Sequence, residues 1–405
     1  MYKNILYSPL ASLVFLVLSS AFFMTFITIQ LNSTHTPESV IGYIHSAFYG
    51  GMLIGAIKSE ELINRIGHIR AYSVFSSLTT ISIILQGLFE HPVAWVMFRF
   101  IAGFALAASY VIIESWLLAQ STKQNKGRIL AIYMFCLYAS QAGSQFLLDI
   151  VDVQTIQPFL LAAILSIMSI IPSSVTYMQA PEIETEQYKM SIAQYFSSAP
   201  LGFIGCSAAG LILSAIYGFL PSYAQDKNLS VSITVGLTIA GGFVLQWPIG
   251  KLSDMLDRSK VISAISFITI ILCLLLMIIP TSTIITYVFC FCIGGLCFTI
   301  YPVCIAYVCD YFEQANIINI TGVLLFSYGI GSVLGSTLVA LLIEHYSASV
   351  IFAYIAFVAL CLGAMSIYTV FKVESVAKEK QVSFVALPRA TPIANNLDPR
   401  IDENQ

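Results

Sequence analysis

The stretch Val93–Leu118, VAWVMFRFIAGFALAASYVIIESWLL, is long and apolar enough to cross a lipid bilayer. It nevertheless contains one cation, Arg99, and one carboxylate, Glu114. A charged side chain at the centre of a bilayer costs about 2.5–3.5 kcal/mol on insertion scales, so such residues usually face a protein interior or a wet pathway. We therefore expect this segment to be a membrane-spanning helix that carries functional side chains.

The whole chain has the composition of a multi-pass membrane protein. Of its 405 residues, 58% are hydrophobic and 10% are charged, which is far from the average of soluble proteins. Twelve apolar segments, each near the length that a spanning helix needs, lie at 9–31, 39–58, 69–89, 92–119, 128–150, 156–178, 200–224, 232–252, 260–280, 284–308, 315–343 and 348–371. We expect an all-α membrane protein with twelve transmembrane helices, the first of which is retained and not cleaved as a signal peptide.

A polar link divides these segments into two sets of six. We expect an N-terminal six-helix bundle at 1–178, a cytoplasmic linker at 179–199 and a C-terminal six-helix bundle at 200–372. The tail, 373–405, combines three prolines with mixed charge and is expected to be disordered. If both termini are cytoplasmic, only Lys227 among the loop cations lies outside, which predicts a multi-pass protein of the inner (plasma) membrane.

An internal repeat connects the two halves. The loop Leu62–Arg70, LINRIGHIR, follows the second apolar segment, and Leu252–Lys260, LSDMLDRSK, follows the eighth. Aligning residue 62 with residue 252, an offset of 190, places Asn64 on Asp254, His68 on Arg258 and Arg70 on Lys260. Duplicated helix bundles that rock about a central site are the usual build of secondary transporters. The repeat therefore predicts two pseudo-symmetric bundles.

Two motifs give this chain a resemblance to the major facilitator superfamily. Gly250-Lys251-Leu252-Ser253-Asp254 resembles the loop signature of that superfamily, and Arg99-Phe-Ile-Ala-Gly103 resembles its fourth-helix Arg-x-x-x-Gly pattern. The first loop is a degraded copy, which keeps Gly67 but has Glu60 and Asn64 where the signature has glycine and aspartate. Three longer stretches, Arg99–Leu118, Leu213–Lys260 and Gly294–Gly335, resemble the uncharacterised YcaD-type branch. The resemblance covers the chain to about Phe371 and implies the major facilitator fold, without indicating a substrate.

The loop signature predicts a set of gating residues. A carboxylate near a helix N-terminus interacts with unpaired N–H groups and partial positive charge. By pseudo-symmetry we expect Asp254 to act on the start of the fifth segment, around Gly127; the alternative is a solvated loop carboxylate. Asn64, which is uncharged, should interact more weakly with the equivalent helix N-terminus. The gating and motif residues are Asn64, Arg65, Gly67, Arg70, Arg99, Gly103, Glu114, Arg128, Gly250, Asp254, Arg258 and Lys260.

The two tryptophans of the fourth segment suggest depths for its charges. Trp95 and Trp116 are about 31 Å apart on a helix, close to the hydrocarbon thickness, and tryptophan favours the interface. Glu114 would then lie at the cytoplasmic edge, as part of an inner gate, as a proton carrier or as a residue that snorkels to the surface. Arg99 would lie deeper, where the resemblance implies a role in proton coupling; the alternative is that it bonds neighbouring carbonyls. Possible partners of Glu114 are Arg65, Arg70 and Arg128.

Aromatic and amide side chains within the apolar segments are candidates for a solute cavity. They are His45, Tyr49, Tyr110, Gln141, Gln145, Tyr217, Gln246, Tyr301 and Tyr328, with Tyr43 and Tyr138 as further members. Such a lining suits a neutral, amphipathic or weakly charged solute. The alternative for each is helix–helix hydrogen bonding or packing, and His45 is either a packing residue or a proton site. Pairs of small residues predict close helix crossings: Gly51 and Gly55, Gly103 and Ala107, Ala139 and Gly143, and Gly331 and Gly335.

These features favour a secondary active transporter that moves a small solute by alternating access. No phosphate-binding loop for ATP and no catalytic cluster is present, so we expect neither an enzyme nor a bound cofactor or metal. The expected partners are a small-molecule solute, possible coupling protons and the lipid bilayer, for a monomer that binds no nucleic acid. The alternative is a multidrug or metabolite efflux protein, although Ser144 follows Gly143 where the drug-antiporter signature has proline. A receptor or membrane enzyme is the less favoured class.

Overall fold

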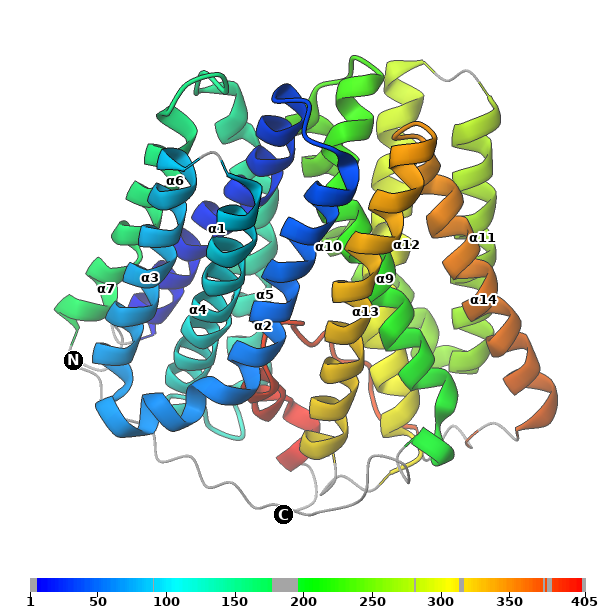
Figure 1. The fold of residues 1–405 in the computed structure, drawn as a ribbon. Helices are drawn as coiled ribbons and strands as arrows, with labels where there is room; N and C mark the ends of the chain where they lie inside the picture. Colours follow the sequence, from blue (N-terminus) through cyan, green and yellow to red (C-terminus); the bar gives the residue numbers. More distant parts are fainter. Residues whose placement is uncertain are drawn as a thin grey trace. The chain divides into compact units, whose positions relative to one another are not determined.

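The computed structural model describes residues 6–89, 91–176, 196–279, 282–312, 317–373, 376 and 381–402. Within these ranges every regular element is helical (Figure 1). Eleven helical stretches there are long and apolar enough to cross a membrane. Residues 179–195 of the expected linker, 179–199, lie outside the described part of the chain.

The chain divides into two compact units. Unit 1 comprises Met1–Thr185 and Pro388–Pro399, and unit 2 comprises Glu186–Leu387 and Arg400–Gln405. The helices of unit 1 are α1 (Tyr7–Ser33), α2 (Glu38–Ile66), α3 (His68–Leu88), α4 (Pro92–Ala119), α5 (Lys126–Ser144), η2 (Gln145–Asp149), α6 (Gln157–Met168), α7 (Ile170–Val175) and η5 (Pro392–Leu397). Those of unit 2 are α9 (Pro200–Asp226), α10 (Val231–Met255), α11 (Arg258–Ile278), α12 (Thr283–Cys309), α13 (Ile317–His345) and α14 (Val350–Lys372).

The expected segment at 128–150 does not form a single apolar α-helix. It is built as α5 followed directly by the 3-10 helix η2, and it is not among the eleven apolar spans. Its sequence explains the difference, because α5 begins with two cations, Lys126 and Arg128, and later carries polar side chains such as Ser140 and Gln141. The expected segment at 156–178 is α6 and α7 in succession, which together make one span over Gln157–Val175.

The repeat seen in the sequence is present in the helix packing. Helices α3 and α11 each have 21 residues and begin at His68 and Arg258, which are 190 residues apart. In unit 1, α2 packs on α4, α1 packs on α5 and α6, and α3 packs on α4 and α6. In unit 2, α10 packs on α12, α9 packs on α13 and α14, and α11 packs on α12 and α14. The two units are therefore pseudo-symmetric copies of one bundle, as the sequence predicts.

Glycines bring an equivalent pair of helices into close contact in each unit. In unit 1, a Cβ at Gly51 would overlap the carbonyl oxygen of Phe100, and a Cβ at Gly103 would overlap that of Phe48. The backbones of α2 and α4 therefore touch where only glycine fits. In unit 2 the same reciprocal contact joins α10 and α12, where Gly241 meets the Phe291 carbonyl and Gly294 meets the Thr238 carbonyl.

The crossing of α9 and α13 has no counterpart of this kind in unit 1. A Cβ at Gly210 would overlap the carbonyl oxygen of Tyr328, and a Cβ at Gly331 that of Ser207. The predicted small-residue contact at Gly331 is thus confirmed. The one predicted at Gly143 of α5 is wrong, because no atom lies within 4 Å of the position of an added Cβ there. Spacing alone could not distinguish the two cases, since it does not say which face of α5 meets a neighbour.

The C-terminal tail differs from the expectation of disorder over its described residues, 381–402. It forms two short 3-10 helices, η5 and η6 (Pro399–Asp402), and each begins at a proline. Leu387, Ala394 and Leu397 are buried. Figure 1 shows η5, drawn in red, beside α4 and α5, which it contacts. The apolar anchors of the tail are too few and too irregularly spaced to produce a periodic signal in the sequence.

Candidate functional site

Arg99 lies in the interior of unit 1, surrounded by soft, uncharged groups. Its side chain is 2% exposed, and its Nη2 donates to the sulfur of Met24 at 2.8 Å. The guanidinium carbon lies 4.1 Å from the centroid of the Phe48 ring and 5.8 Å from that of Phe23. In the described part of the chain no carboxylate pairs with it. The prediction that Arg99 bonds neighbouring carbonyls is therefore wrong: ring faces and a thioether stabilise the cation.

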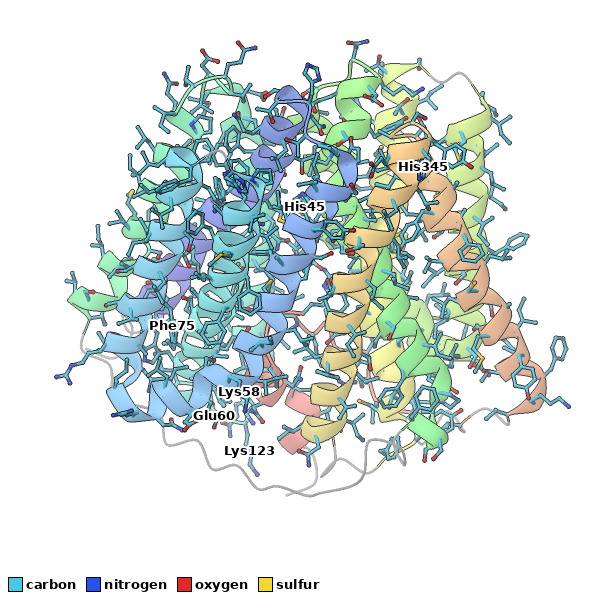
Figure 2. The ribbon with its side chains drawn as sticks, in the orientation of Figure 1. His45, Lys58, Glu60, Phe75, Lys123 and His345 are labelled. Atoms are coloured by element: carbon cyan, nitrogen blue, oxygen red, sulfur yellow. The ribbon has the colours of Figure 1, made fainter. Side chains whose placement is uncertain are left out.

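Two of the predicted solute-lining residues lie within the electrostatic range of this cation. They are His45 and Tyr49, both on α2 and both buried. His45 Nε2 forms a 2.9 Å hydrogen bond with the hydroxyl of Thr28 on α1, so this histidine joins two helices as the packing alternative predicts. Figure 2 places His45 toward one end of α2 and Lys58 and Glu60 at the opposite end. Arg99, His45 and Tyr49 together form what we call the arginine cluster.

Glu114 occupies a second buried position on α4. It is fully buried, and its Oε1 accepts a 2.7 Å hydrogen bond from the hydroxyl of Tyr133 on α5. Its Oε2 accepts a hydrogen bond from the hydroxyl of Thr391 in the tail. The predicted ion pairs of Glu114 are wrong: Arg65, Arg70 and Arg128 are all exposed at the surface, and no cation pairs with Glu114 among the described residues. Two neutral hydroxyls satisfy the carboxyl in their place.

The tryptophans of α4 face the interior of unit 1. Trp95 is 5% exposed and donates to the carbonyl oxygen of Phe89, while Trp116 is 1% exposed and packs against Tyr72. Both rings fill the core of unit 1, and the depths expected for Arg99 and Glu114 stay predictions. Trp247 of α10, at 72% exposed, is the tryptophan on the surface.

The charges of α4 have no counterpart in unit 2. The equivalent glycine contacts align Gly103 with Gly294, an offset of 191 residues. At this offset Cys290 stands in the place of Arg99, and Ile305 in the place of Glu114. Both replacements are buried in α12. The duplicated bundle therefore has an arginine and a glutamate in one copy and neither an arginine nor a carboxylate at the same positions in the other.

The remaining predicted lining residues fall into separate groups within each unit. In unit 1, Tyr110 and Gln145 are buried, and the Gln145 amide donates to the Gln141 carbonyl at 3.2 Å. In unit 2, Tyr301 and Tyr328 meet edge to face with ring centroids 5.2 Å apart. There too, Tyr217 packs on Phe298 and Gln246 is buried. These contacts are the packing and hydrogen bonding expected as the alternative to a cavity lining.

One hollow of about 290 Å³ lies in unit 2, and its lining includes none of these residues. Side chains of α9, α13 and α14 line it, among them Phe203, Leu211 and Phe357. Its lining is almost wholly apolar, with Ser207 and Ser327 as the hydroxyl-bearing members. A polar solute would find few hydrogen-bonding partners there.

The second loop signature contains a buried ion pair that the sequence does not indicate. Arg258 Nε donates to Asp310 Oδ2 at 2.7 Å, and the two side chains are 1% and 4% exposed. Asp254 contacts the same guanidinium at 3.3 Å, but its side chain is 36% exposed. Burial raises the pKa of the Asp310 carboxyl, and the adjacent Arg258 acts in the opposite direction. Asp310, directly after α12, is therefore the buried partner of Arg258, and Asp254 is the more exposed one.

The first loop uses different residues at the equivalent positions. His68, on the position of Arg258, is likewise buried at the start of its helix. Gly67 has φ +84°, a conformation that favours glycine, and it ends α2 and begins α3. Asn64, Arg65 and Arg70 are exposed. The first loop thus differs from the second in its backbone, since Asp257 at the position of Gly67 has φ −58°, and His68 replaces the arginine of the ion pair.

Comparison with known proteins identifies the family of this chain. The sequence pattern described as the Major Facilitator Superfamily matches residues 10–302. The chain belongs to this superfamily. It is 31% identical over 354 residues to a protein of Escherichia fergusonii named an uncharacterized MFS-type transporter, YcaD, with 86% of this chain and 91% of that protein covered. This protein is therefore a multi-pass membrane transporter and not an enzyme.

Solved structures of the superfamily share the fold at low sequence identity. The nucleoside transporter NupG matches with a TM-score of 0.75 and 14% identity, over 92% of this chain and all of that one. A D-xylose-proton symporter matches with a TM-score of 0.69 and 12% identity, over 92% of this chain and 98% of that one. The two six-helix bundles are accordingly those of the major facilitator fold.

Proposed function

We propose that this transporter is a secondary active transporter, which moves a small solute across the inner membrane by alternating access and couples the movement to protons. The observation that carries the proposal is the presence of two buried charged residues on α4, Arg99 and Glu114. Arg99 and Glu114 are both buried without an ion-pair partner among the described residues, and Cys290 and Ile305 replace them in unit 2. Ionisable residues inside membrane bundles are costly and usually serve ion or proton pathways.

Glu114 is the group that we propose to carry the proton. Neutral hydroxyls satisfy both of its oxygens, so the carboxyl can bind or release a proton without breaking an ion pair. Arg99, with no carboxylate to neutralise it, supplies fixed positive charge within range of His45 and Tyr49. That charge would attract an electron-rich group of the solute to the arginine cluster. The proton and the solute would thus both bind to side chains of α4.

The transport proposal is tested by solute flux into proteoliposomes with and without an imposed pH gradient. The solute panel includes nucleosides and D-xylose, which two structural neighbours carry by their names, together with amphipathic cations that test multidrug efflux. Accumulation that rises with the pH gradient supports proton coupling. Flux that is equal with and without the gradient would restrict the proposal to facilitated movement, and no flux for any solute would contradict it.

We propose that both termini lie in the cytoplasm and that the protein functions as a monomer. The orientation is tested with two single-cysteine variants, Gln124→Cys in the loop after α4 and Asn228→Cys in the loop after α9, since both residues are exposed. A membrane-impermeant maleimide added to intact cells should label the cysteine at 228 and not the one at 124. The reverse pattern would overturn the orientation.

A further inference from the structure

The part of the tail that belongs to unit 1, residues 388–399, lies along α5 of the same unit. Near its start, Arg389 Nη2 donates to the hydroxyl of Tyr138 at 2.6 Å, and its guanidinium lies 5.9 Å from the centroid of that ring. At its end, the ring of Pro399 lies 3.8 Å from the position of a Cβ added at Gly127. Tyr138 and Gly127 are about 16 Å apart along α5. The segment therefore runs antiparallel to this helix.

Between these two ends the segment contacts Glu114. The Thr391 hydroxyl donates to Glu114, and the backbone N–H of Ala394 hydrogen-bonds to the same carboxyl group. The hydroxyl of Tyr133 on α5 donates to the other oxygen at 2.7 Å. Glu114 and Thr391 are both fully buried. The tail therefore forms part of the wall that separates this carboxyl from water.

The 3-10 helix η5 adds two apolar anchors and one polar group that opposes docking. Ala394 and Leu397 are fully buried, and η5 contacts α4 and α5 (Figure 1). Asn395 is also buried, but neither its amide nitrogen nor its amide oxygen has a hydrogen-bond partner among the described residues. Burial of an amide without hydrogen bonds is unfavourable. The docked segment thus combines specific bonds to Glu114 with a side chain whose burial favours release.

We propose that residues 389–399 form a plug of unit 1, which keeps water from Glu114 while it is docked and which is poised to leave because it buries Asn395. The inference rests on the proposed role of Glu114 as proton carrier, since a carboxyl exchanges protons with solvent only when water reaches it. Short segments with few buried contacts are the parts of a protein that open at least cost. The contacts of Arg389, Thr391 and Ala394 all lie within unit 1.

Docking of the plug is tested by trypsin cleavage after Arg389 in the purified full-length protein, followed by mass spectrometry. The Thr391→Val variant keeps the shape of the side chain and removes its hydroxyl. Cleavage should accelerate by about 10- to 100-fold, because loss of a hydrogen bond to a charged group raises the population of the undocked plug. Thr122→Val is the matched control, since its side chain is exposed in the loop after α4. Equal rates in the two variants would overturn docking at Glu114.

The same cleavage assay tests the role of Asn395 with a change of opposite sign. Asn395→Leu replaces the amide by an apolar side chain of similar size, so cleavage after Arg389 should slow by about 5- to 30-fold, because the docked state no longer buries an unpartnered amide. Asn64→Leu makes the same replacement at an exposed position of α2 and should leave the rate unchanged. Unchanged or faster cleavage in Asn395→Leu would overturn a plug that is poised to leave.

Access of water to Glu114 is tested with a water-soluble carbodiimide and methylamine, which convert an accessible carboxyl into an amide that mass spectrometry detects. Glu61, an exposed carboxylate of α2, is the internal reference. Relative to Glu61, Glu114 should react about 10-fold faster or more in Thr391→Val and in a chain that stops after Leu387 than in the full chain. Equal reactivity of Glu114 in all three would overturn the plug. Since no readout uses a solute or a pH gradient, absence of flux would contradict the proposed function alone.

Discussion

The guanidinium of Arg99 stacks on the ring of Phe48, 4.1 Å from guanidinium carbon to ring centroid, in a place that water does not reach. Phe48 belongs to α2 and Arg99 to α4, the two helices that glycines bring into backbone contact. The cation is therefore held at the tightest crossing of unit 1. Its position is fixed by packing and not by a counter-ion.

Replacement of Phe48 by leucine should lower stability by about 0.5–2 kcal/mol, because the cation loses a ring face while the volume stays apolar. Arg99→Ala should abolish solute flux in proteoliposomes under the proposed mechanism. Lys58→Ala, which removes an exposed cation of α2, is the control and should leave both properties unchanged. Wild-type flux in Arg99→Ala would show that α4 is only a scaffold.

Replacement of Asp310 by alanine should destabilise the protein by about 3–5 kcal/mol, because Arg258 would remain buried with only the more exposed Asp254 beside it. Asp254→Ala should cost about 0–1 kcal/mol, as expected for a carboxylate that is partly exposed. Chemical unfolding in detergent measures both values. Similar costs for the two variants would contradict the unequal roles of these carboxylates.

Replacement of Gly103 by alanine should destabilise the protein by about 1–3 kcal/mol, since the added methyl group would overlap the carbonyl oxygen of Phe48. Gly143→Ala meets open space and should be neutral or stabilise α5 by about 0.4–1 kcal/mol. The two variants add the same atoms in the same unit, so their difference in thermal unfolding temperature isolates the contact. Equal shifts would show that α2 and α4 are less closely packed than described.

Replacement of Glu114 by glutamine should preserve the fold, because the amide oxygen can still accept the hydrogen bond from Tyr133. Under the proposed mechanism it should abolish accumulation driven by a pH gradient and leave solute exchange at equal pH. Tyr133→Phe removes the donor and should cost about 1–3 kcal/mol of stability. Gradient-driven accumulation by Glu114→Gln at the wild-type level would exclude this residue as the proton carrier.

The sequence predicts the features that depend on short-range pattern. Apolar length predicts the helices, and the offset from Leu62 to Leu252 recovers the equal starts of α3 and α11. The glycine pairs of α2 and α4 were visible because close contact in lipid favours small residues at a fixed spacing.

Contacts between residues far apart in the chain could not be predicted in this way. Arg99 meets Met24 across 75 residues and Glu114 meets Thr391 across 277, and neither partner belongs to a motif. Asp310 could be seen as a carboxylate that follows an apolar segment, but nothing in the pattern indicates that it is buried against Arg258. The cations that the sequence suggests as partners of Glu114 are wrong, because two hydroxyl groups satisfy this carboxylate inside the bundle.

The equal lengths of α3 and α11 also bear on the lipid that surrounds them. With 21 residues each, they extend about 32 Å, close to the about 30 Å of hydrocarbon in a typical bilayer. Helices α2 and α13, with 29 residues each, extend about 44 Å and must tilt or project into the headgroups. In a thicker membrane the bilayer would therefore have to thin around α3 and α11, one in each bundle, while α2 and α13 still have length to spare.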